Sequence, residues 1–287
     1  MRYRLAYRES ILSVLCDEGL DGVAYDAMFE ARSEVESKIA EDPFFGITYD
    51  PYPVSEDDPE LVRMMCRASG IAGVGPMAGV AGAVAYCVAD ALISEGSSHA
   101  VVENGGDIAF CSREPRLVGI YADHPVLRDM AFRVSSDRII GICSSSRTVG
   151  PPVSLGNSSI STVFADDVVL ADCCATALGN LVRDERSLAS AVETVGSMDG
   201  VSGCLACCDG KVAMYGDVPE IVPADCSDVT PNRVPRRKKG REARFCSLTV
   251  TDPSRHLQLA GLDRWSAPPE YRDPAGVRRC SRSPANR

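Results

Sequence analysis

Histidine and tryptophan are scarce in this chain, with three His and one Trp among 287 residues. No Gly-x-Ser-x-Gly motif and no Walker-type phosphate loop occurs. The Cys-x-x-Cys pair of Cys204 and Cys207 has neither a second pair nor a nearby His to complete a four-ligand zinc site. His99 falls at a predicted strand start, where a structural role is commoner than that of a catalytic base. These shortages argue against a zinc site and a histidine-dependent hydrolase.

A secretory leader and a long apolar run are also missing. The chain opens Met-Arg-Tyr-Arg, and we find no apolar run of signal-peptide length and no uninterrupted stretch that would span a membrane. Its 13 Cys, an odd number with irregular spacing, are typical of reduced cytosolic thiols. We therefore expect a cytoplasmic protein with no membrane partner.

The net charge of -10 hides an asymmetry along the chain. Residues 231–287 hold 14 Lys/Arg against 5 Asp/Glu, whereas the remaining residues hold 16 against 35. The acidic body would repel phosphate backbones, so we expect it to bind no nucleic acid. The basic end is rich in Pro, Arg and Ser and lacks periodicity, which is typical of a disordered tail. We predict a folded domain over residues 1–222 and a tail over 223–287.

Hydrophobic periodicity within the body predicts strands that alternate with groups of helices. Residues 42–57, rich in Pro, Asp, Gly and Tyr, are predicted to form a long loop. The predicted elements are a hairpin over 2–16, helices over 20–39, 60–68, 78–93 and 185–195, strands over 99–103, 107–110, 117–121, 130–134, 138–143 and 159–165, and a hairpin over 201–215.

A further helix is predicted to follow Asp166 and Asp167, either of which can cap its first turn. Its residues are small or apolar on every side, which predicts burial, and Asp172 is the one charge inside it. An isolated buried carboxylate must be neutralised, hydrogen-bonded or metal-bound. Thr176 lies one turn further on the same face, so the two oxygens could hold Mg²⁺ or Ca²⁺. A plain hydrogen bond from Asp172 to Thr176 or to the backbone is the alternative.

Glycines precede and enter the helix predicted over 78–93. Gly75, Gly79 and Gly82 would let another part of the chain or a ligand approach closely, and a helix N-terminus can receive a phosphate. Close packing against a sheet is the commoner explanation for such spacing.

Two polar segments complete the candidate residues. Asn104-Gly105-Gly106 predicts a tight hairpin turn, with Glu103, Asn104 and Asp107 crowded at its tip. Ser144-Ser145-Ser146-Arg147-Thr148 opens a polar loop after a predicted strand. Each segment alone is also compatible with an ordinary turn or loop.

The order and spacing of four blocks resemble the small cytosolic branch of the ApbE-like superfamily, and the resemblance covers roughly residues 1–216. The blocks are Gly75-Pro-Met-Ala-Gly-Val-Ala-Gly82, Val102-Glu-Asn-Gly-Gly-Asp-Ile108, Cys143-Ser-Ser145 and Ala171-Asp-Cys-Cys-Ala-Thr-Ala-Leu-Gly179.

The founding enzymes of this superfamily are FAD:protein FMN transferases, which bind FAD and a divalent cation and move FMN onto a Thr or Ser hydroxyl of an acceptor protein. The resemblance implies an α+β fold, a mostly antiparallel sheet with packed helices, and Mg²⁺ held by Asp172 and Thr176. It also implies a site for FAD or FMN. The residues expected to line that site are Gly75, Gly79, Gly82, Asn104, Gly105, Gly106, Asp107, Ser144, Ser145 and Thr148.

The chain departs from the family pattern in one loop. Arg147 stands where Gly is usual and Pro151 where His is usual, which leaves the catalytic residues and the transfer reaction open. Two other functions therefore stay in view: an accessory factor in sulfide assimilation toward homocysteine, acting through Cys173, Cys174 or protein contacts, and a non-catalytic binding module. The expected partners are a flavin nucleotide or another small molecule and an acceptor or sulfur-pathway protein, and the pattern is also compatible with a homo-oligomer.

Overall fold

The computed structural model describes residues 1–120, 127, 129–145, 156–224 and 248–251. The chain divides into a unit over Met1–Arg255 and a second over His256–Arg287, and the second lies wholly outside the described residues. All elements below belong to the first unit. They are β1 (Arg2–Tyr7), β2 (Ser10–Leu15), α1 (Asp21–Glu41), α2 (Glu60–Ala72), η1 (Pro76–Gly79), α3 (Val80–Ser94), β3 (Ala100–Asn104), β4 (Asp107–Ile120), β5 (Met130–Ser145), β6 (Ile160–Ala165), α4 (Val168–Leu181), η2 (Glu185–Ser187), α5 (Leu188–Gly196), β7 (Val201–Cys208), β8 (Lys211–Gly216), β9 (Ile221–Pro223) and β10 (Leu248–Thr251).

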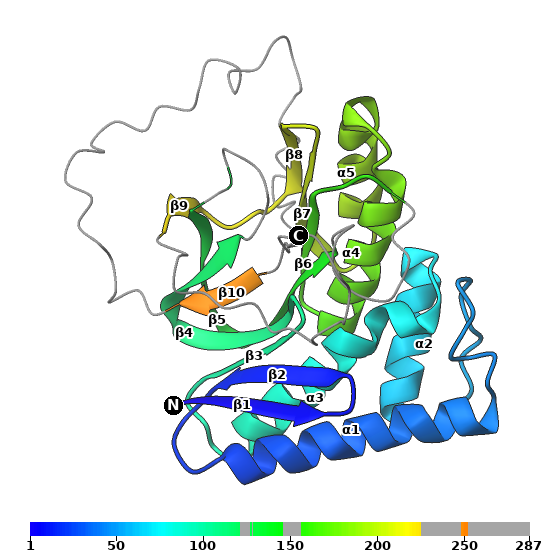
Figure 1. Cartoon of the computed structure of the whole chain (residues 1–287), viewed down its shortest axis with the longest axis vertical. Coiled ribbons are helices and arrows are strands. Elements are labelled where there is room, and N and C mark those ends of the chain that lie inside the picture. Colours follow the sequence, from blue (N-terminus) through cyan, green and yellow to red (C-terminus); the bar gives the residue numbers. More distant parts are fainter. Residues whose placement is uncertain (121–126, 128, 146–155, 225–247, 252–287) are drawn as a thin grey trace, which may run out of the picture. The chain divides into compact units, whose positions relative to one another are not determined.

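The described strands form one sheet in which β1 to β8 lie in chain order and every pair is antiparallel. The short strands β9 and β10 pair with β5 and β4. Among the described residues, helices enter the meander after β2 and after β6 (Figure 1). The predicted α+β fold, a mostly antiparallel sheet with packed helices, is confirmed.

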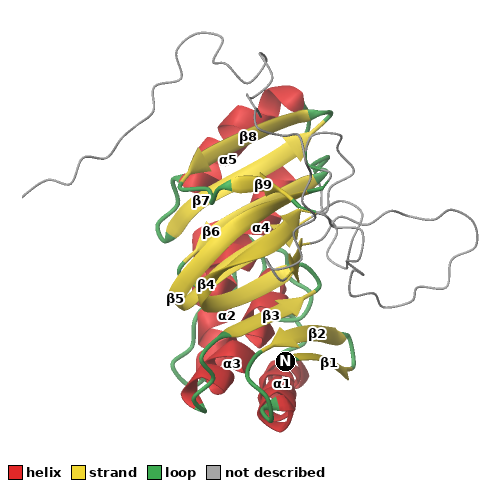
Figure 2. Cartoon of the chain, turned by 90° about the vertical axis from the view of Figure 1, so that its left-hand side faces the viewer, coloured by secondary structure: helices red, strands yellow, loops and turns green. Residues whose placement is uncertain are grey.

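The helices gather on one face of this sheet (Figure 2). There α3 packs on β3 and β4, α4 on β5 and β6, and α5 on β7, while α1 packs on α3. The main hydrophobic core lies between these helices and the sheet. A second apolar cluster, which includes Phe110, Phe132 and Phe164, lies on residues that point to the opposite face of the strands.

Helix α4 begins where the sequence predicted, because Asp167 caps it. The Asp167 Oδ1 accepts hydrogen bonds from the backbone N–H groups of Val169 at 2.8 Å and Leu170 at 3.1 Å. Most of the helix is buried, as its uniformly apolar sequence predicted, and the buried residues include Asp172.

The helical stretch Pro76–Ser94 corrects one expectation. Among the described residues it alone is a helix long and apolar enough to cross a membrane, although the sequence was expected to hold no such stretch. It packs against α1, α4, β3 and β4, and a core helix passes the same test of length and composition.

Other differences concern element lengths. Helix α2 runs to Ala72, four residues beyond its predicted end, and closes on Gly73 in a left-handed conformation (φ +69°). The predicted strands at 107–110 and 117–121 are one strand, β4, and those at 130–134 and 138–143 are one strand, β5. The register of the β4–β5 pairing is irregular between Phe110 and Arg116, so the two strands bend there. The sequence predicted a break in each strand at this bend. The boundary at residue 222 and the disordered tail stay predictions.

The contact between α3 and α4 gives a first test. A Cβ on Gly82 would lie 2.9 Å from both the Cβ of Asp172 and the carbonyl oxygen of Val168. We expect Gly82→Ala to lower the free energy of unfolding by about 1–3 kcal/mol, because packed backbone must move apart. Gly70 is the matched control, since it is also helical and its Cβ would meet nothing within 4 Å. Gly70→Ala should raise stability by about 0.5–1 kcal/mol. Urea unfolding of both variants decides, and a Gly82→Ala protein as stable as wild type would contradict this packing.

Candidate functional site

Asp172 lies in α4 and faces the first turn of α3. Its carboxylate is buried, and Oδ2 accepts a hydrogen bond from the backbone N–H of Gly82 at 2.7 Å. The N–H of Ala81 is a second backbone donor to the same carboxylate. Both donors belong to the start of α3, where backbone N–H groups have no partner within the helix. Asp172 is thus hydrogen-bonded to backbone, although not to Thr176.

Asp107 reaches the same place from the sheet. It is the first residue of β4, after the turn at Gly105 and Gly106, whose φ angles of +70° and +115° favour glycine. Its Oδ1 accepts a hydrogen bond from the backbone N–H of Ser144 on β5, at 3.3 Å. On the preceding strand, Asn104 donates from Nδ2 to the carbonyl oxygen of Ala81 at 3.1 Å, which ties the turn to the start of α3.

The two carboxyl groups form a buried pair. Burial raises the pKa of Asp172 to about 7, while the hydrogen bonds from Gly82 and from Asp107 act in the opposite direction. Burial also raises the pKa of Asp107 well above its usual range, and the negative charge of Asp172 raises it further. Two carboxylates in such a setting disfavour simultaneous ionisation. We infer that the pair keeps at least one proton at neutral pH when no cation lies beside it.

The structure brings five of the predicted residues together around this pair, namely Gly82, Asn104, Asp107, Ser144 and Asp172. The Ser144 side chain points away, because its Oγ lies 2.8 Å from Thr162 Oγ1 on β6. Ser145 ends β5, and Thr176 lies half-buried one turn along α4. Thr148, like Arg147 and Pro151, lies outside the described residues.

The three predicted glycines allow close packing, which was the commoner explanation for their spacing. They pack against helix α4 and against the loop at Thr48, whereas packing against a sheet was expected. A Cβ on Gly79 would lie 2.8 Å from Cys173 Sγ, and one on Gly75 would lie 2.0 Å from the carbonyl oxygen of Thr48. The turn differs, since a Cβ on Gly105 would meet nothing within 4 Å. A cofactor role for these residues stays a prediction.

Sequence reasoning missed the pairing of Asp107 with Asp172. We assigned Asp107 to cofactor binding and Asp172 to a metal, without placing the two carboxyl groups in contact. A signal was present, because Asp107 opens a strand whose next residues, Ile108 to Phe110, are apolar and buried. A charge at the start of a fully buried strand requires a buried partner. The 64 residues between the two Asp hid the identity of this partner.

The donor set around the pair suits a hard divalent cation. Within the described residues, no Lys, Arg or His forms an ion pair with Asp107 or Asp172, so a cation would neutralise charge that is otherwise suppressed by protonation. No group of three or more His, Cys, Asp or Glu that could hold a metal occurs in the same residues. Hydroxyl, carbonyl or water oxygens would have to complete the coordination. Mg²⁺ tolerates this arrangement, because it commonly keeps several waters beside one or two carboxylates.

The thiols near the pair are poor nucleophiles. Cys143, Cys173 and Cys174 are fully buried. Burial raises the pKa of the Cys174 thiol to about 12 and those of Cys143 and Cys173 well above the ordinary range. A thiol held neutral by burial is inert in most thiolate chemistry. These residues pack as small apolar side chains in the core.

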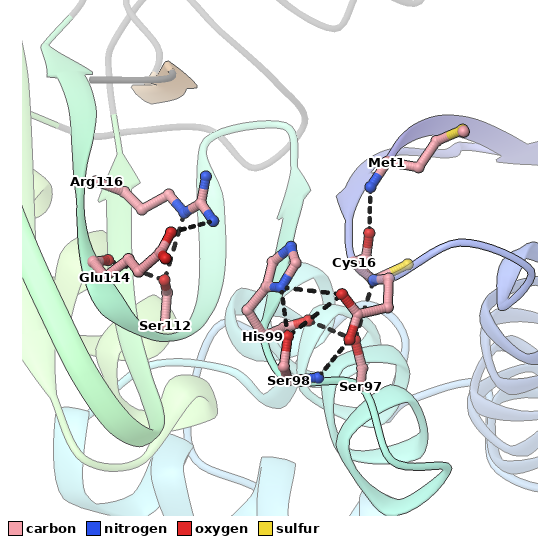
Figure 3. A network of polar contacts seen from close by, with 9 residues as sticks. Met1, Cys16, Ser97, Ser98, His99, Ser112, Glu114 and Arg116 are labelled. Atoms are coloured by element: carbon pink, nitrogen blue, oxygen red, sulfur yellow. Dashed lines mark hydrogen bonds and ion pairs between the residues drawn. The ribbon is translucent and has the colours of Figure 1, made fainter. Parts of the chain in front are cut away.

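A second polar cluster surrounds His99, in the loop between α3 and β3 and beside the end of β2 (Figure 3). His99 Nδ1 lies 3.1 Å from Ser98 Oγ and 3.5 Å from Asp17 Oδ1, so both oxygens meet the same ring nitrogen. A relay would need the acid and the hydroxyl on opposite nitrogens. Asp17 also accepts from the backbone N–H of Ser98 at 2.6 Å, which ties the end of β2 to the start of β3. The cluster is structural, as predicted for His99.

The fold of the chain is similar to that of known proteins. The sheet with helices on one face resembles the apbe protein of Thermotoga maritima, with a TM-score of 0.54, 10% identity and coverage of 81% of this chain and 100% of that one. It also resembles the flavin transferase ApbE of Vibrio cholerae, with a TM-score of 0.51, 15% identity and coverage of 75% and 96%. At these identities the likeness establishes an ApbE-like fold.

The particular family follows from sequence. A family model described as AbpE bacteria matches residues 1–206. The UPF0280 protein of Methanocella arvoryzae is 44% identical over 218 residues, which cover 76% of this chain and 89% of that protein. The chain belongs to the UPF0280 family of ApbE-like proteins, and the resemblance predicted from the four blocks is confirmed.

The raised pKa values give a second test. A carboxyl whose folded pKa exceeds its unfolded value stabilises the protein below the unfolded pKa, and this stabilisation is lost as the pH rises through the folded pKa. For Asp172 the window runs from about pH 4 to about pH 7. In the presence of EDTA, the Asp172 carboxyl should therefore lower the free energy of unfolding of the wild-type protein by roughly 2–3 kcal/mol between pH 5 and pH 8.

The variants separate this effect from general destabilisation. Asp172→Asn should make the decline smaller, and the decline that remains belongs to Asp107 and Glu103, whose pKa values burial also raises. Thr176→Val, on the same helix, removes no titrating group and should keep the wild-type slope. Urea unfolding at both pH values measures the slopes, and equal slopes in wild type and Asp172→Asn would show that the Asp172 carboxyl does not titrate in this window.

Proposed function

We propose that this protein is a flavin-nucleotide transferase that binds FAD with a divalent cation at the Asp107–Asp172 pair and transfers FMN to a hydroxyl group of an acceptor protein. The observation that carries the proposal is the buried carboxyl pair itself, formed where the start of α3, the middle of α4 and the β3–β4 turn meet. Membership of an ApbE-like family supports the same reaction class. FAD and the divalent cation are assigned to this chain on the basis of that family relationship.

Three described residues would supply ligands to the cation. Asp172 is fixed by the backbone donors of α3, Asp107 is fixed by the Ser144 N–H, and Thr176 offers a hydroxyl one turn along α4. Such fixed positions lower the cost of assembling a site when its ligand arrives. A bound Mg²⁺ would screen the charge of the FAD pyrophosphate and stabilise the departing AMP.

The turn and the start of α3 would shape the nucleotide end of the site. Gly105 carries no side chain on an open side of the turn, so its backbone can approach a ligand closely. Asn104 holds this turn against Ala81. We infer that the flavin nucleotide lies along the turn, with its phosphates toward the carboxyl pair.

The proposed reaction is a phosphoryl-group transfer from FAD to the acceptor hydroxyl. The acceptor hydroxyl oxygen forms a bond to the phosphorus of the FMN half, and the bond from that phosphorus to the bridging pyrophosphate oxygen breaks. AMP leaves with the bridging oxygen, and the hydroxyl proton passes to a base or to solvent. In-line positioning of the two oxygens supplies most of the catalysis in reactions of this class.

The buried thiols weigh against the sulfide-assimilation alternative in its thiol form. Cys173 has no exposed surface, and Cys173 and Cys174 are protonated at neutral pH because burial raises their pKa values. A role through protein contacts is not affected by this observation.

Titration with FAD tests the proposal. Wild-type protein should bind FAD in the presence of Mg²⁺, and EDTA should weaken the binding at least tenfold, as measured by quenching of flavin fluorescence and by calorimetry. Asp172→Asn should abolish the Mg²⁺ dependence, because a neutral amide is a poor ligand for a hard cation. Asp167→Asn is the matched control, since it makes the same exchange on the same helix and Asn also caps helices well.

The outcome is read from the difference between the two variants. Asp167→Asn should bind FAD as the wild type does, and a full-length protein that binds no FAD at any Mg²⁺ concentration would refute the proposal. Equal losses in both variants would assign the effect to the helix instead of the carboxyl pair.

A further inference from the structure

The segment between α1 and α2, residues 42–59, exposes large apolar side chains although it is firmly held. Phe44, Ile47 and Tyr49 have exposed fractions of 59%, 71% and 69%, and Val54 has 44%. Exposed apolar side chains concentrated on one segment are typical of an interaction surface. We define Phe44, Ile47, Tyr49 and Val54 as the 44–54 surface.

Hydrogen bonds and a buried ion pair fix the shape of this segment. Lys38 of α1 pairs with Asp58 at 2.7 Å, and both side chains are buried. Tyr52 donates to Asp42 at 2.6 Å, and its ring packs edge-on against buried Phe45 with ring centroids 5.2 Å apart. Backbone hydrogen bonds close a turn from Asp42 to Thr48. The exposed side chains therefore extend from a prearranged backbone, which reduces the entropy lost on binding.

The charge of the segment defines the partner. Residues 41–60 contain seven Asp and Glu and no Lys or Arg. Lys38 pairs with Asp58, and Arg63 and Arg67 of α2 pair with Glu56 and Glu60. Asp50 and Asp57 are exposed and form no ion pair with any described residue. Complementary charge steers association and suppresses wrong partners. A partner suited to this surface combines large apolar side chains with Lys or Arg.

The surface is joined directly to the carboxyl site. Thr48, between Ile47 and Tyr49, places its carbonyl oxygen where a Cβ of Gly75 would be. Gly75 precedes η1, which leads into α3 and the Gly82 N–H that binds Asp172. The seven residue steps from Gly75 to Gly82 rise about 12 Å in these helical conformations. The 44–54 surface therefore packs against the chain seven residues before the Gly82 N–H that binds Asp172.

We propose that the 44–54 surface docks the acceptor protein through a segment that carries both basic and large apolar side chains, with the hydroxyl to be modified next to it. This proposal rests on the proposed function for the identity of the partner as acceptor, whereas the surface itself is argued from exposure, charge and position.

Peptide binding to the full-length protein tests the surface. The probes are two fluorescein-labelled 12-residue peptides with a central Thr, one alternating Arg with Leu and one alternating Glu with Leu. The wild-type protein should bind the Arg–Leu peptide at least tenfold more tightly than the Glu–Leu peptide, as measured by fluorescence anisotropy. Rising salt should weaken this binding.

Three variants locate the contact. Ile47→Asp should weaken binding of the Arg–Leu peptide about tenfold, because it replaces an apolar contact by a desolvated charge. The double variant Asp50→Lys/Asp57→Lys should weaken it about fivefold through lost attraction and new repulsion. Met214→Asp on β8 is the matched control, since Met214 is also exposed, with a fraction of 48%, and belongs to an edge strand of the sheet. It should bind as the wild type does.

Contrary results are equally specific. Equal affinity for the two peptides, no binding by the wild type, or an equal loss in Met214→Asp would overturn the docking surface. A wild-type dimer that Ile47→Asp converts to a monomer, as seen by light scattering, would assign the surface to self-association and also overturn the proposal.

FAD titration of the same variants separates the two proposals. Ile47→Asp should keep Mg²⁺-dependent FAD binding and lose FMN transfer to the Arg–Leu peptide, as followed by mass spectrometry. If no variant and no wild-type protein binds FAD while the peptides are still discriminated, the proposed function fails and the docking surface stands without its acceptor. If FAD binds and the peptides are not discriminated, the proposed function stands and the docking surface fails.

Discussion

The carboxylate of Asp172 bound to the Gly82 N–H is the contact on which the arrangement of this site depends. It joins the buried helix α4 to the first turn of α3, with the two backbones so close that only glycine fits at position 82. An apolar helix that contained an unpaired carboxylate would be unstable, so the sequence of α4 requires a donor at this place. The start of α3 supplies such donors at no cost to its own helix, because its first N–H groups have no acceptor within it. The β3–β4 turn is then positioned through Asn104 and Asp107.

The hydrogen bond between Asp172 and the Gly82 N–H is a structural requirement and does not by itself indicate a ligand site. Backbone donors would satisfy Asp172 alone, and a lone hydrogen-bonded Asp would call for no ligand. The second carboxyl, that of Asp107, indicates a ligand site. No basic side chain in the described part of the protein neutralises the added charge, which is suppressed by protonation instead. Placing two acids together is unfavourable for stability. Such an arrangement is typical of sites where a charge partner is brought by the ligand.

Sequence reasoning predicted the local features and missed the long-range ones. The cap at Asp167, the burial of α4, the Gly105-Gly106 turn and the β7–β8 hairpin each depend on short stretches of chain, and each was predicted. The continuity of β4 and β5 was missed, because polar residues at the bend interrupt the alternation of both strands. The segments that pack against Gly75, Gly79 and Gly82 were missed. A glycine indicates that another part of the chain lies close to it but does not indicate which part. The Asp107–Asp172 pair was hidden for the same reason: no pattern within either motif refers to the other.

The order of elements has a consequence for how the chain folds. Two strands, a set of helices and two strands occur twice in succession, first from β1 to β4 and again from β5 to β8. Helix α3 and Asp107 belong to the first of these halves, whereas α4 and Asp172 belong to the second. The site is therefore a seam, completed only when both halves have formed and closed on each other across a separation of 90 residues. Contacts of such separation form late because the intervening chain must first be ordered. A ligand that binds both carboxyl groups would hold the two halves together. Its binding would therefore depend on the assembly of the domain and would stabilise the assembled state.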